Sequence, residues 1–328
     1  MGSARRGGSV EDEVLVVGGG VSGLTTAVVL AEAGRPVRLV SDRAPGETTS
    51  AVAGGLWEPY LAEPRERVAE WAFRTLPTLV ALAEHPAETG VRMVEGIKAQ
   101  RTPEPVPPWW LPSLPGALRP LRAPELPPGF RSGYAATMPL LDMPHYLGYL
   151  TDRLRAAGGR IERRRLRSLD EATATARLVV NCTGLAARKL VPDLEVRPIQ
   201  GQLVVVENPG LDRWLVAEPI EGEESLYLLP QPGGLLLGGT ARRDRWGTEP
   251  DPELAARIVR RCARVFPELA TARVLEHRVG LRPFRPRVRL AAEPTGDGRV
   301  TVHNYGHGGC GVTVSWGCAR EAAGLLPR

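Results

Sequence analysis

The feature that most constrains the fold of this chain is a glycine pattern close to its N-terminus. The apolar run Val14–Val17 is followed at once by Gly18-x-Gly20-x-x-Gly23, and then by residues 24–33, which have helix-forming composition and no proline. In such a strand–turn–helix unit the glycines permit the tight turn, the approach of a pyrophosphate and close helix packing. The helix N-terminus then directs free N–H groups at the phosphates. The pattern predicts a dinucleotide-binding unit that contains Gly18, Gly19, Gly20, Val21, Ser22 and Gly23.

The residues after this helix extend the pattern. Gly34 ends the helix, residues 36–41 form a second apolar run, and Asp42 follows at about the spacing of the acid that binds a ribose hydroxyl. Taken alone, this unit fits NAD as well as FAD. An NAD-linked dehydrogenase and a non-catalytic nucleotide-binding protein therefore both stay open at this stage.

Composition excludes several other classes of protein. The net charge is +5, but only Lys98 and Lys189 among the 42 basic residues are lysines, and the arginines are spread along the chain instead of forming a stripe, so we expect no nucleic-acid partner. No apolar run reaches the length of roughly 18 residues that spans a bilayer, and we expect no membrane partner. The four cysteines have no C-x-x-C or metal-ligand spacing, so we expect no metal site. We expect a cytoplasmic protein with a loose tail over residues 1–11.

The middle of the chain alternates between helical and extended patterns. Helices are predicted over 65–83 and 142–158, strands over 160–166 and 178–181, and irregular loops over the proline-rich stretch 102–128. Short alternating runs with Gly-Gly pairs then predict an antiparallel or mixed sheet from strands at 203–207, 225–229 and 235–239.

A second glycine-rich loop, residues 301–313, precedes a predicted helix near the C-terminus. Two such loops at opposite ends of one chain indicate a long ligand that is held at both ends. The following segments resemble D-amino-acid oxidases and occur in the same order: 53–60, 181–184, 201–202, 280–286 and His303-Asn-Tyr-Gly-His-Gly-Gly. The resemblance spans nearly the whole chain.

This resemblance implies an α/β fold with a Rossmann-like FAD-binding domain and a second, mixed-sheet substrate-binding domain interleaved in the sequence. The FAD-binding domain would comprise 12–57, 138–195 and 280–328, and the substrate-binding domain would comprise 58–137 and 196–279. FAD would be bound non-covalently, with its pyrophosphate at residues 18–23. The C-terminal helix would direct its positive end at the flavin edge where negative charge accumulates.

Further cofactor contacts are implied by the resemblance. Asp42 and Arg43 would lie near the adenosine ribose, with Thr49 and Ser50 close by. Leu166 and Thr183 match further cofactor-contacting positions of the family. Around the flavin the implied contacts are Gly54, Gly55, Leu56, Gly308, Gly309, Gly311, Val312, Thr313 and Arg282.

For the substrate, Arg282 resembles the arginine that pairs with the α-carboxylate, which suits a planar guanidinium group. Tyr227 resembles the tyrosine that hydrogen-bonds the same carboxylate, and Gly309 would offer a carbonyl to the amine. The implied reaction is hydride transfer from the Cα of a D-amino acid to flavin N5, followed by hydrolysis to a 2-oxo acid and ammonia, with dioxygen converted to hydrogen peroxide. Orientation would carry the reaction without a catalytic histidine or aspartate.

The sequence constrains the preferred substrate less than it constrains the cofactor. Residues 219–224 replace a longer lid found in many eukaryotic members, and three glutamates there favour neutral or basic D-amino acids. Against this, Arg242 and Arg243 lie close to where D-aspartate oxidases place a side-chain-binding arginine. A glycine or sarcosine oxidase would share the fold, and some relatives attach flavin through a cysteine, for which Cys310 is the candidate. A homodimer is left open.

Overall fold

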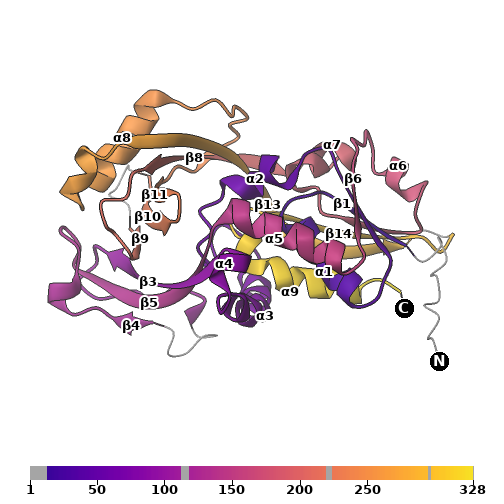
Figure 1. Ribbon diagram of the computed structural model, residues 1–328, viewed down its shortest axis with the longest axis horizontal. Helices are drawn as coiled ribbons and strands as arrows, with labels where there is room; N and C mark the ends of the chain where they lie inside the picture. Colours follow the sequence, from indigo (N-terminus) through magenta and orange to yellow (C-terminus); the bar gives the residue numbers. More distant parts are fainter. Residues whose placement is uncertain (1–12, 112–117, 219–223, 295–296, 328) are drawn as a thin grey trace.

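The computed structural model describes residues 13–111, 118–218, 224–294 and 297–327. The expected tail, residues 1–11, lies outside these ranges, as does residue 328. The molecule is elongated, with a parallel sheet toward one end and a mixed sheet toward the other (Figure 1). In the described part of the chain, no helix has the length and apolar character needed to cross a bilayer.

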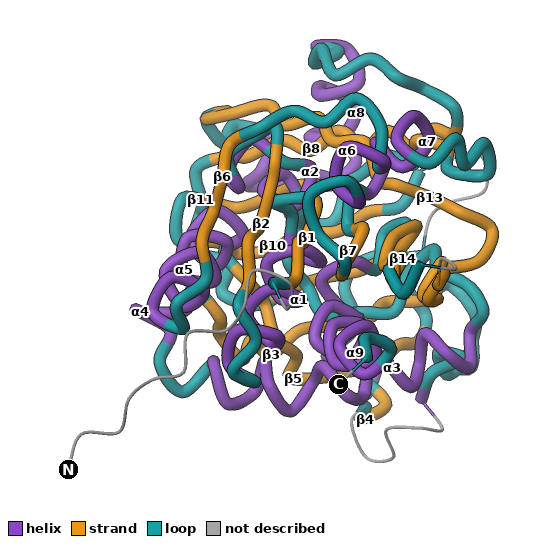
Figure 2. The backbone as a smooth tube through the Cα atoms, turned by 90° about the vertical axis from the view of Figure 1, so that its right-hand side faces the viewer, coloured by secondary structure: helices purple, strands orange, loops and turns teal. Residues whose placement is uncertain are grey.

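The first part is a parallel sheet with strand order β6-β2-β1-β7-β14. Figure 2 shows these strands side by side, with helices on both sides of them. The strands are β1 (Val14–Val17), β2 (Val37–Ser41), β6 (Arg160–Arg163), β7 (Leu178–Asn181) and β14 (Val300–His307). The helices are α1 (Val21–Glu32), α2 (Thr49–Val52), α3 (Arg65–Leu82), α4 (Pro86–Thr89), α5 (Met143–Ala156), α6 (Asp170–Thr173), α7 (Ala187–Leu190) and α9 (Gly311–Gly324).

Strand β1 shows why a continuous apolar run was needed here. All four of its residues are buried, because helices cover both faces of a parallel sheet. Val14 and Val16 belong to the core that includes residues of α1 and α9, whereas Leu15 and Val17 pack with Ala172 of α6 on the opposite face. The predicted Rossmann-like sheet is confirmed.

The second part is a mixed sheet. Its strands are β3 (Val91–Gln100), β4 (Arg119–Pro120), β5 (Ser132–Leu141), β8 (Arg197–Val206), β9 (Trp214–Ala217), β10 (Leu226–Gln231), β11 (Gly234–Gly238), β12 (Arg242–Arg243) and β13 (Val274–Pro294). The β3–β9 pair is parallel and the other pairs are antiparallel, which confirms the mixed sheet. Short 3₁₀ helices cover Pro45–Glu47, Ala123–Glu125, Gly184–Ala186 and Pro267–Ala270.

Helix α8 (Pro252–Ala263) covers one face of the mixed sheet. It begins at Pro252 because the side chain of Asp251 accepts a hydrogen bond from the Leu254 N–H and because proline suits a first helical position. Its apolar side packs with alternate residues of β10, including Leu226 and Leu228. The other residues of these strands therefore face the rest of the molecule.

Strand β13 joins the two sheets into one. It pairs with β8 from Val274 to Phe284 and with β14 from Phe284 to Pro294. The predicted domain boundary at residues 279–280 lies inside this strand, and the two-domain division of the chain stays a prediction.

Two local expectations were wrong. The strand expected over 160–166 ends at Arg163, where β6 stops pairing with β2. Residues 301–307, expected as part of a glycine-rich loop, belong to β14, because they pair with β7 and β13 and are buried on both faces. The proline-rich stretch 102–128 is irregular except for β4 and one 3₁₀ turn, as predicted for its described residues.

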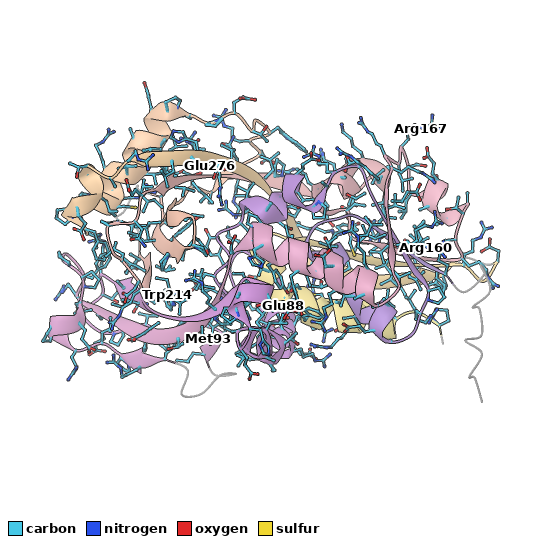
Figure 3. The ribbon with its side chains drawn as sticks, viewed as in Figure 1. Glu88, Met93, Arg160, Arg167, Trp214 and Glu276 are labelled. Carbon is cyan, nitrogen blue, oxygen red and sulfur yellow. The ribbon has the colours of Figure 1, made fainter. Side chains whose placement is uncertain are left out.

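The arginines are distributed over the surface. Arg160 and Arg167 lie at one end of the molecule and Trp214 lies toward the other (Figure 3). Arg167 pairs with Glu171 at 2.8 Å, and Arg163 pairs with Glu47 at 3.2 Å. These two arginines thus have carboxylate partners on the surface.

Candidate functional site

The first glycine loop is shaped by close contacts that leave no room for a side chain. A Cβ atom on Gly18 would lie 2.4 Å from the Cys182 carbonyl oxygen, and one on Gly23 would lie 1.8 Å from the Gly18 carbonyl oxygen. Gly18 also has φ of +116°, a conformation that strongly favours glycine. The glycines thus bring the start of α1 close to the end of β7.

The start of α1 is open toward a ligand. No side chain caps Gly20, and the first turn contains no acidic residue. One N–H group, that of Val21, donates to Ser50 Oγ at 3.0 Å. The other orphan N–H groups of the first turn are suited to phosphate oxygens.

The second glycine loop brings another helix start to the same place. Gly308, with φ of +55°, is so close to the chain that a Cβ atom would lie 2.1 Å from the Leu61 carbonyl oxygen. Helix α9 begins at Gly311 without a side-chain cap or an acidic first turn, and a Cβ atom there would lie 3.9 Å from Val21 of α1. The two helix N-termini converge, which fits a ligand with separate electron-rich groups.

The segment 54–58 is fixed against the start of α9. Thr313 Oγ1 donates to the Glu58 carbonyl oxygen at 3.0 Å and accepts from the Glu58 N–H at 3.3 Å. Gly55 is held by a close approach to Leu141, whose carbonyl oxygen would lie 2.1 Å from a Cβ atom. Residues 54–56 thus precede a residue, Glu58, that is fixed at the start of α9, and their contacts with the flavin stay a prediction.

Asp42, Arg43 and Thr49, which the resemblance places at the cofactor, lie just beyond strand β2. Asp42 and Arg43 are exposed just beyond β2, where Ser41 Oγ donates to the Arg43 carbonyl oxygen at 2.8 Å. Thr49 begins α2 and lies near Gly280 of β13.

Three predicted contacts use their side chains elsewhere. Thr183 donates to Asn181 Oδ1 at 2.7 Å, Leu166 is buried against the core of the parallel sheet, and Ser22 Oγ lies 3.4 Å from His307 Nδ1. The roles of these three residues at the cofactor stay predictions.

Arg282 and Tyr227 are brought together by the mixed sheet. The two side chains lie close enough for the charge of Arg282 to act on the Tyr227 hydroxyl, and Arg282 Nη1 donates to the Thr240 carbonyl oxygen at 2.9 Å. Burial raises the pKa of Tyr227 above its usual value, and the charge of Arg282 opposes that rise. The Tyr227 hydroxyl therefore stays protonated at neutral pH and can donate to a carboxylate that pairs with Arg282.

Three glycines, Gly201, Gly238 and Gly239, pack directly against the side chains of Arg282 and Tyr227. A Cβ atom on Gly201 would lie 2.4 Å from Arg282 Nη1, and Cβ atoms on Gly238 and Gly239 would lie 2.0 Å and 2.5 Å from atoms of Tyr227. Any side chain at these three positions would occupy the space of the two functional groups. This explains the Gly-Gln and Gly-Gly-Thr segments, whose function the sequence did not reveal.

Tyr60 also belongs to the site, although it was not predicted as a functional residue. A Cβ atom on Gly309 would lie 2.7 Å from its ring, and Tyr60 lies close enough to Tyr227 to affect the pKa of that hydroxyl. Its side chain is 41% exposed. The sequence signal was its place at the end of the segment 53–60, where an exposed aromatic residue follows paired glycines.

The arginines proposed to bind an acidic side chain have other partners. Arg242 Nε lies 3.7 Å from Glu224 Oε1, and Arg242 Nη1 lies 4.0 Å from Asp251 Oδ2. Arg243 Cζ lies over the ring of Phe284, 5.0 Å from its centroid. Both belong to β12, which pairs with β8. Neither arrangement favours an acidic side chain in the substrate.

Cys310 is the candidate for covalent flavin attachment. It is fully buried, and burial raises the pKa of its thiol to about 12. The thiol is therefore protonated at neutral pH, which makes it a poor nucleophile. This favours the non-covalent cofactor that the sequence predicted.

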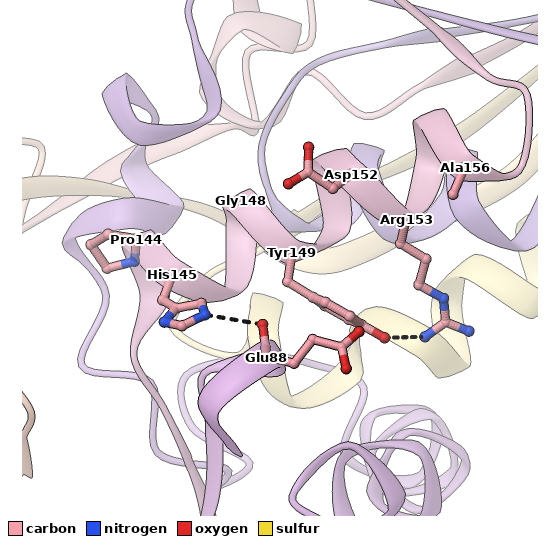
Figure 4. A pocket seen from close by; sticks show the side chains of 8 residues that line it. All are labelled: Glu88, Pro144, His145, Gly148, Tyr149, Asp152, Arg153 and Ala156. Atoms are coloured by element: carbon pink, nitrogen blue, oxygen red, sulfur yellow. Dashed lines mark hydrogen bonds between the residues drawn. The ribbon is translucent and has the colours of Figure 1, made fainter. Parts of the chain in front are cut away.

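A separate hollow of about 700 Å³ lies between α4 and α5 (Figure 4). His145 Nε2 lies 3.0 Å from the Glu88 carbonyl oxygen, and Arg153 donates to the Tyr149 hydroxyl while pairing with Glu32. None of the predicted site residues lines this hollow. We therefore place the candidate active site at the converging helix starts and the Arg282–Tyr227 pair.

Residues 13–325 match the model of a family described as FAD dependent oxidoreductases, and the chain belongs to this family. Its cofactor is FAD. Within the family, the chain is 56% identical to a D-amino-acid oxidase of Streptomyces coelicolor, a match that covers 96% of this chain and 97% of the relative. It is 51% identical to a D-amino-acid oxidase of Rubrobacter xylanophilus, with 97% of each chain covered.

Solved structures share the fold. A glycine oxidase from Geobacillus kaustophilus superposes with a TM-score of 0.78 at 21% identity, covering 95% of this chain and 93% of that one. This likeness shows that the chain has the same fold as that structure.

Proposed function

We propose that this protein is a D-amino-acid oxidase that converts D-amino acids to 2-oxo acids, ammonia and hydrogen peroxide. The observation that carries the proposal is the Arg282–Tyr227 pair, which packs against Gly201, Gly238 and Gly239 and lies near Gly54. A guanidinium and a phenolic hydroxyl that lie close together are suited to binding a carboxylate. The relatives named D-amino-acid oxidase support the same reaction.

The residues contribute binding and orientation. Arg282 and Tyr227 would hold the α-carboxylate, and the Gly309 carbonyl would accept a hydrogen bond from the amine. FAD, when bound, would supply the electron acceptor for oxidation of the substrate at Cα. Holding Cα at a fixed position relative to the acceptor is the protein's main contribution to the rate.

Neutral or basic D-amino acids are the proposed substrates. The partners of Arg242 and Arg243 disfavour acidic side chains. Of the three glutamates expected near the mouth, only Glu224 lies among the described residues, and its carboxylate is 3.7 Å from Arg242. The cytoplasmic location and the homodimer stay predictions from the sequence.

An anaerobic absorbance spectrum tests the proposal. The purified protein should be yellow, and D-alanine but not L-alanine should bleach the flavin band. Bleaching by glycine or sarcosine in preference to D-alanine would support a glycine oxidase instead, and preference for D-aspartate would support a D-aspartate oxidase. Loss of bleaching with every D-amino acid would refute the proposed function.

A further inference from the structure

Lys98 and Glu58 form a partly buried ion pair beside the mixed sheet. Lys98 Nζ contacts Glu58 Oε1, and the two side chains are only 27% and 20% exposed. Placing two charges in a largely covered position carries a desolvation cost, so simple solubility does not explain the pair. Lys98 is also one of only two lysines in a chain rich in arginine.

The strand register places Lys98 on the same face of the sheet as Tyr227. Lys98 of β3 is paired with Val216 of β9, and Val216 is paired with Tyr227 of β10. Directly paired residues point to the same face of a sheet. Neighbouring strands lie about 4.8 Å apart, so the Cα atoms of Lys98 and Tyr227 are separated by roughly 10 Å along this row.

The opposite face of these strands is occupied by the apolar core beneath α8. Ala99 and Leu215, the neighbours of Lys98 and Val216, belong to that core together with Ile258 of α8. The side chains of Tyr227, Val216 and Lys98 therefore point away from α8, toward the side of the sheet where Arg282 and the segment 54–60 lie.

Glu58 reaches this row from the cofactor side. Its backbone is fixed at both its N–H and its carbonyl oxygen by Thr313 in the first turn of α9. The Glu58–Lys98 pair thus connects the start of α9 to β3, at the end of the row opposite Arg282. A substrate that is held by its carboxylate at Arg282 and Tyr227, and whose side chain extends along this row, would meet Val216 and then the Lys98–Glu58 pair.

We propose that the Lys98–Glu58 pair forms the distal wall of the substrate side-chain site and keeps that wall electrically neutral, which selects D-amino acids with uncharged side chains. This inference rests on the proposed function and narrows its substrate class. Each charge of the pair already has its partner, so a charged substrate side chain meets one attractive and one repulsive group. Removing one member leaves a single charge that attracts side chains of the opposite sign.

Two single substitutions test the inference in opposite directions. Glu58→Gln leaves Lys98 uncompensated, and the ratio of kcat/KM for D-glutamate to that for D-glutamine should rise about tenfold. Lys98→Met leaves Glu58 uncompensated, and the ratio for D-lysine to D-norleucine should rise about tenfold. D-glutamine and D-norleucine serve as matched uncharged substrates, so that a general loss of activity cancels from each ratio.

Two further variants complete the experiment. Glu95→Gln removes a carboxylate from the same strand but from the opposite face, where Glu95 lies 3.6 Å from Arg213, and it should leave both ratios unchanged. The double variant E58K/K98E exchanges the two charges and so keeps the pair neutral, and it should have the wild-type ratios. It can be measured even if one of the single variants fails to fold.

Ratios that stay within about twofold of wild type in the single variants would overturn the inference and leave the pair a structural contact. That outcome differs from failure of the proposed function, in which the wild-type protein would not oxidise D-glutamine or D-norleucine at all.

Discussion

Substituting Gly201 by alanine should impair the proposed reaction although Gly201 carries no chemical group. A Cβ atom there would lie 2.4 Å from Nη1 and 2.6 Å from Cζ of Arg282. An ordinary contact between such atoms is about 3.5 Å, so the guanidinium must move by roughly 1 Å. A misplacement of this size can lower the rate about 100-fold, equivalent to about 2.7 kcal/mol of lost transition-state stabilisation.

The assay is hydrogen peroxide formation from D-alanine, with kcat and KM measured separately. The clash involves the far end of a flexible side chain, and we therefore expect the melting temperature to change little. Gly247→Ala is the matched control, because its Cβ atom would lie at an ordinary 3.8 Å from Gln200, the neighbour of Gly201. If Gly201→Ala kept kcat/KM within about threefold of wild type, the proposed position of Arg282 at the carboxylate would be refuted.

Three further predictions concern other parts of the site. Arg282→Ala should lower kcat/KM for D-alanine by about 30-fold or more, as expected for loss of a charge-assisted pair worth about 2–5 kcal/mol, and near-normal kinetics would contradict the role of Arg282. Acid precipitation should release the same fraction of FAD from Cys310→Ser as from the wild type. Burial raises the pKa of the Cys310 thiol to about 12, and we expect no bond between this thiol and the cofactor. A larger released fraction from the variant would show covalent attachment in the wild type. Burial lowers the pKa of His307 to about 4 from its ordinary 6.5, so the unfolded state binds the extra proton first as the pH falls. The free energy of unfolding should then decrease by about 3 kcal/mol from His307 between about pH 6.5 and pH 4, and chemical denaturation of His307→Asn should show a shallower pH dependence.

The sequence predicted the elements that depend on local pattern. The glycine spacing of residues 18–23 specified a strand, a turn and a helix start, and the structure contains all three. Arg282 could be proposed because it lies within a recognisable segment of the chain. The structure adds its partner contacts with Tyr227 and Thr240, which join segments more than 40 residues apart.

The features that were not predicted depend on register between distant strands. Nothing local indicates that Lys98 lies in one row with Val216 and Tyr227, because a shift of one residue in either pairing would direct the side chain to the α8 face. The extended conformation of residues 301–307 was missed for a related reason. The glycine and histidine content of this segment is typical of a loop, whereas pairing with two neighbouring strands makes it part of the sheet.

Strand β13 has a consequence for how proteins with this architecture can evolve. Arg282 lies within a single strand of 21 residues that pairs with β8 on its first part and β14 on its second. Inserting or deleting one residue between Gly280 and Phe284 would reverse the direction of the Arg282 side chain or break the ladder on one side. Changes in length should therefore accumulate in the loops, while this strand can vary only by substitution.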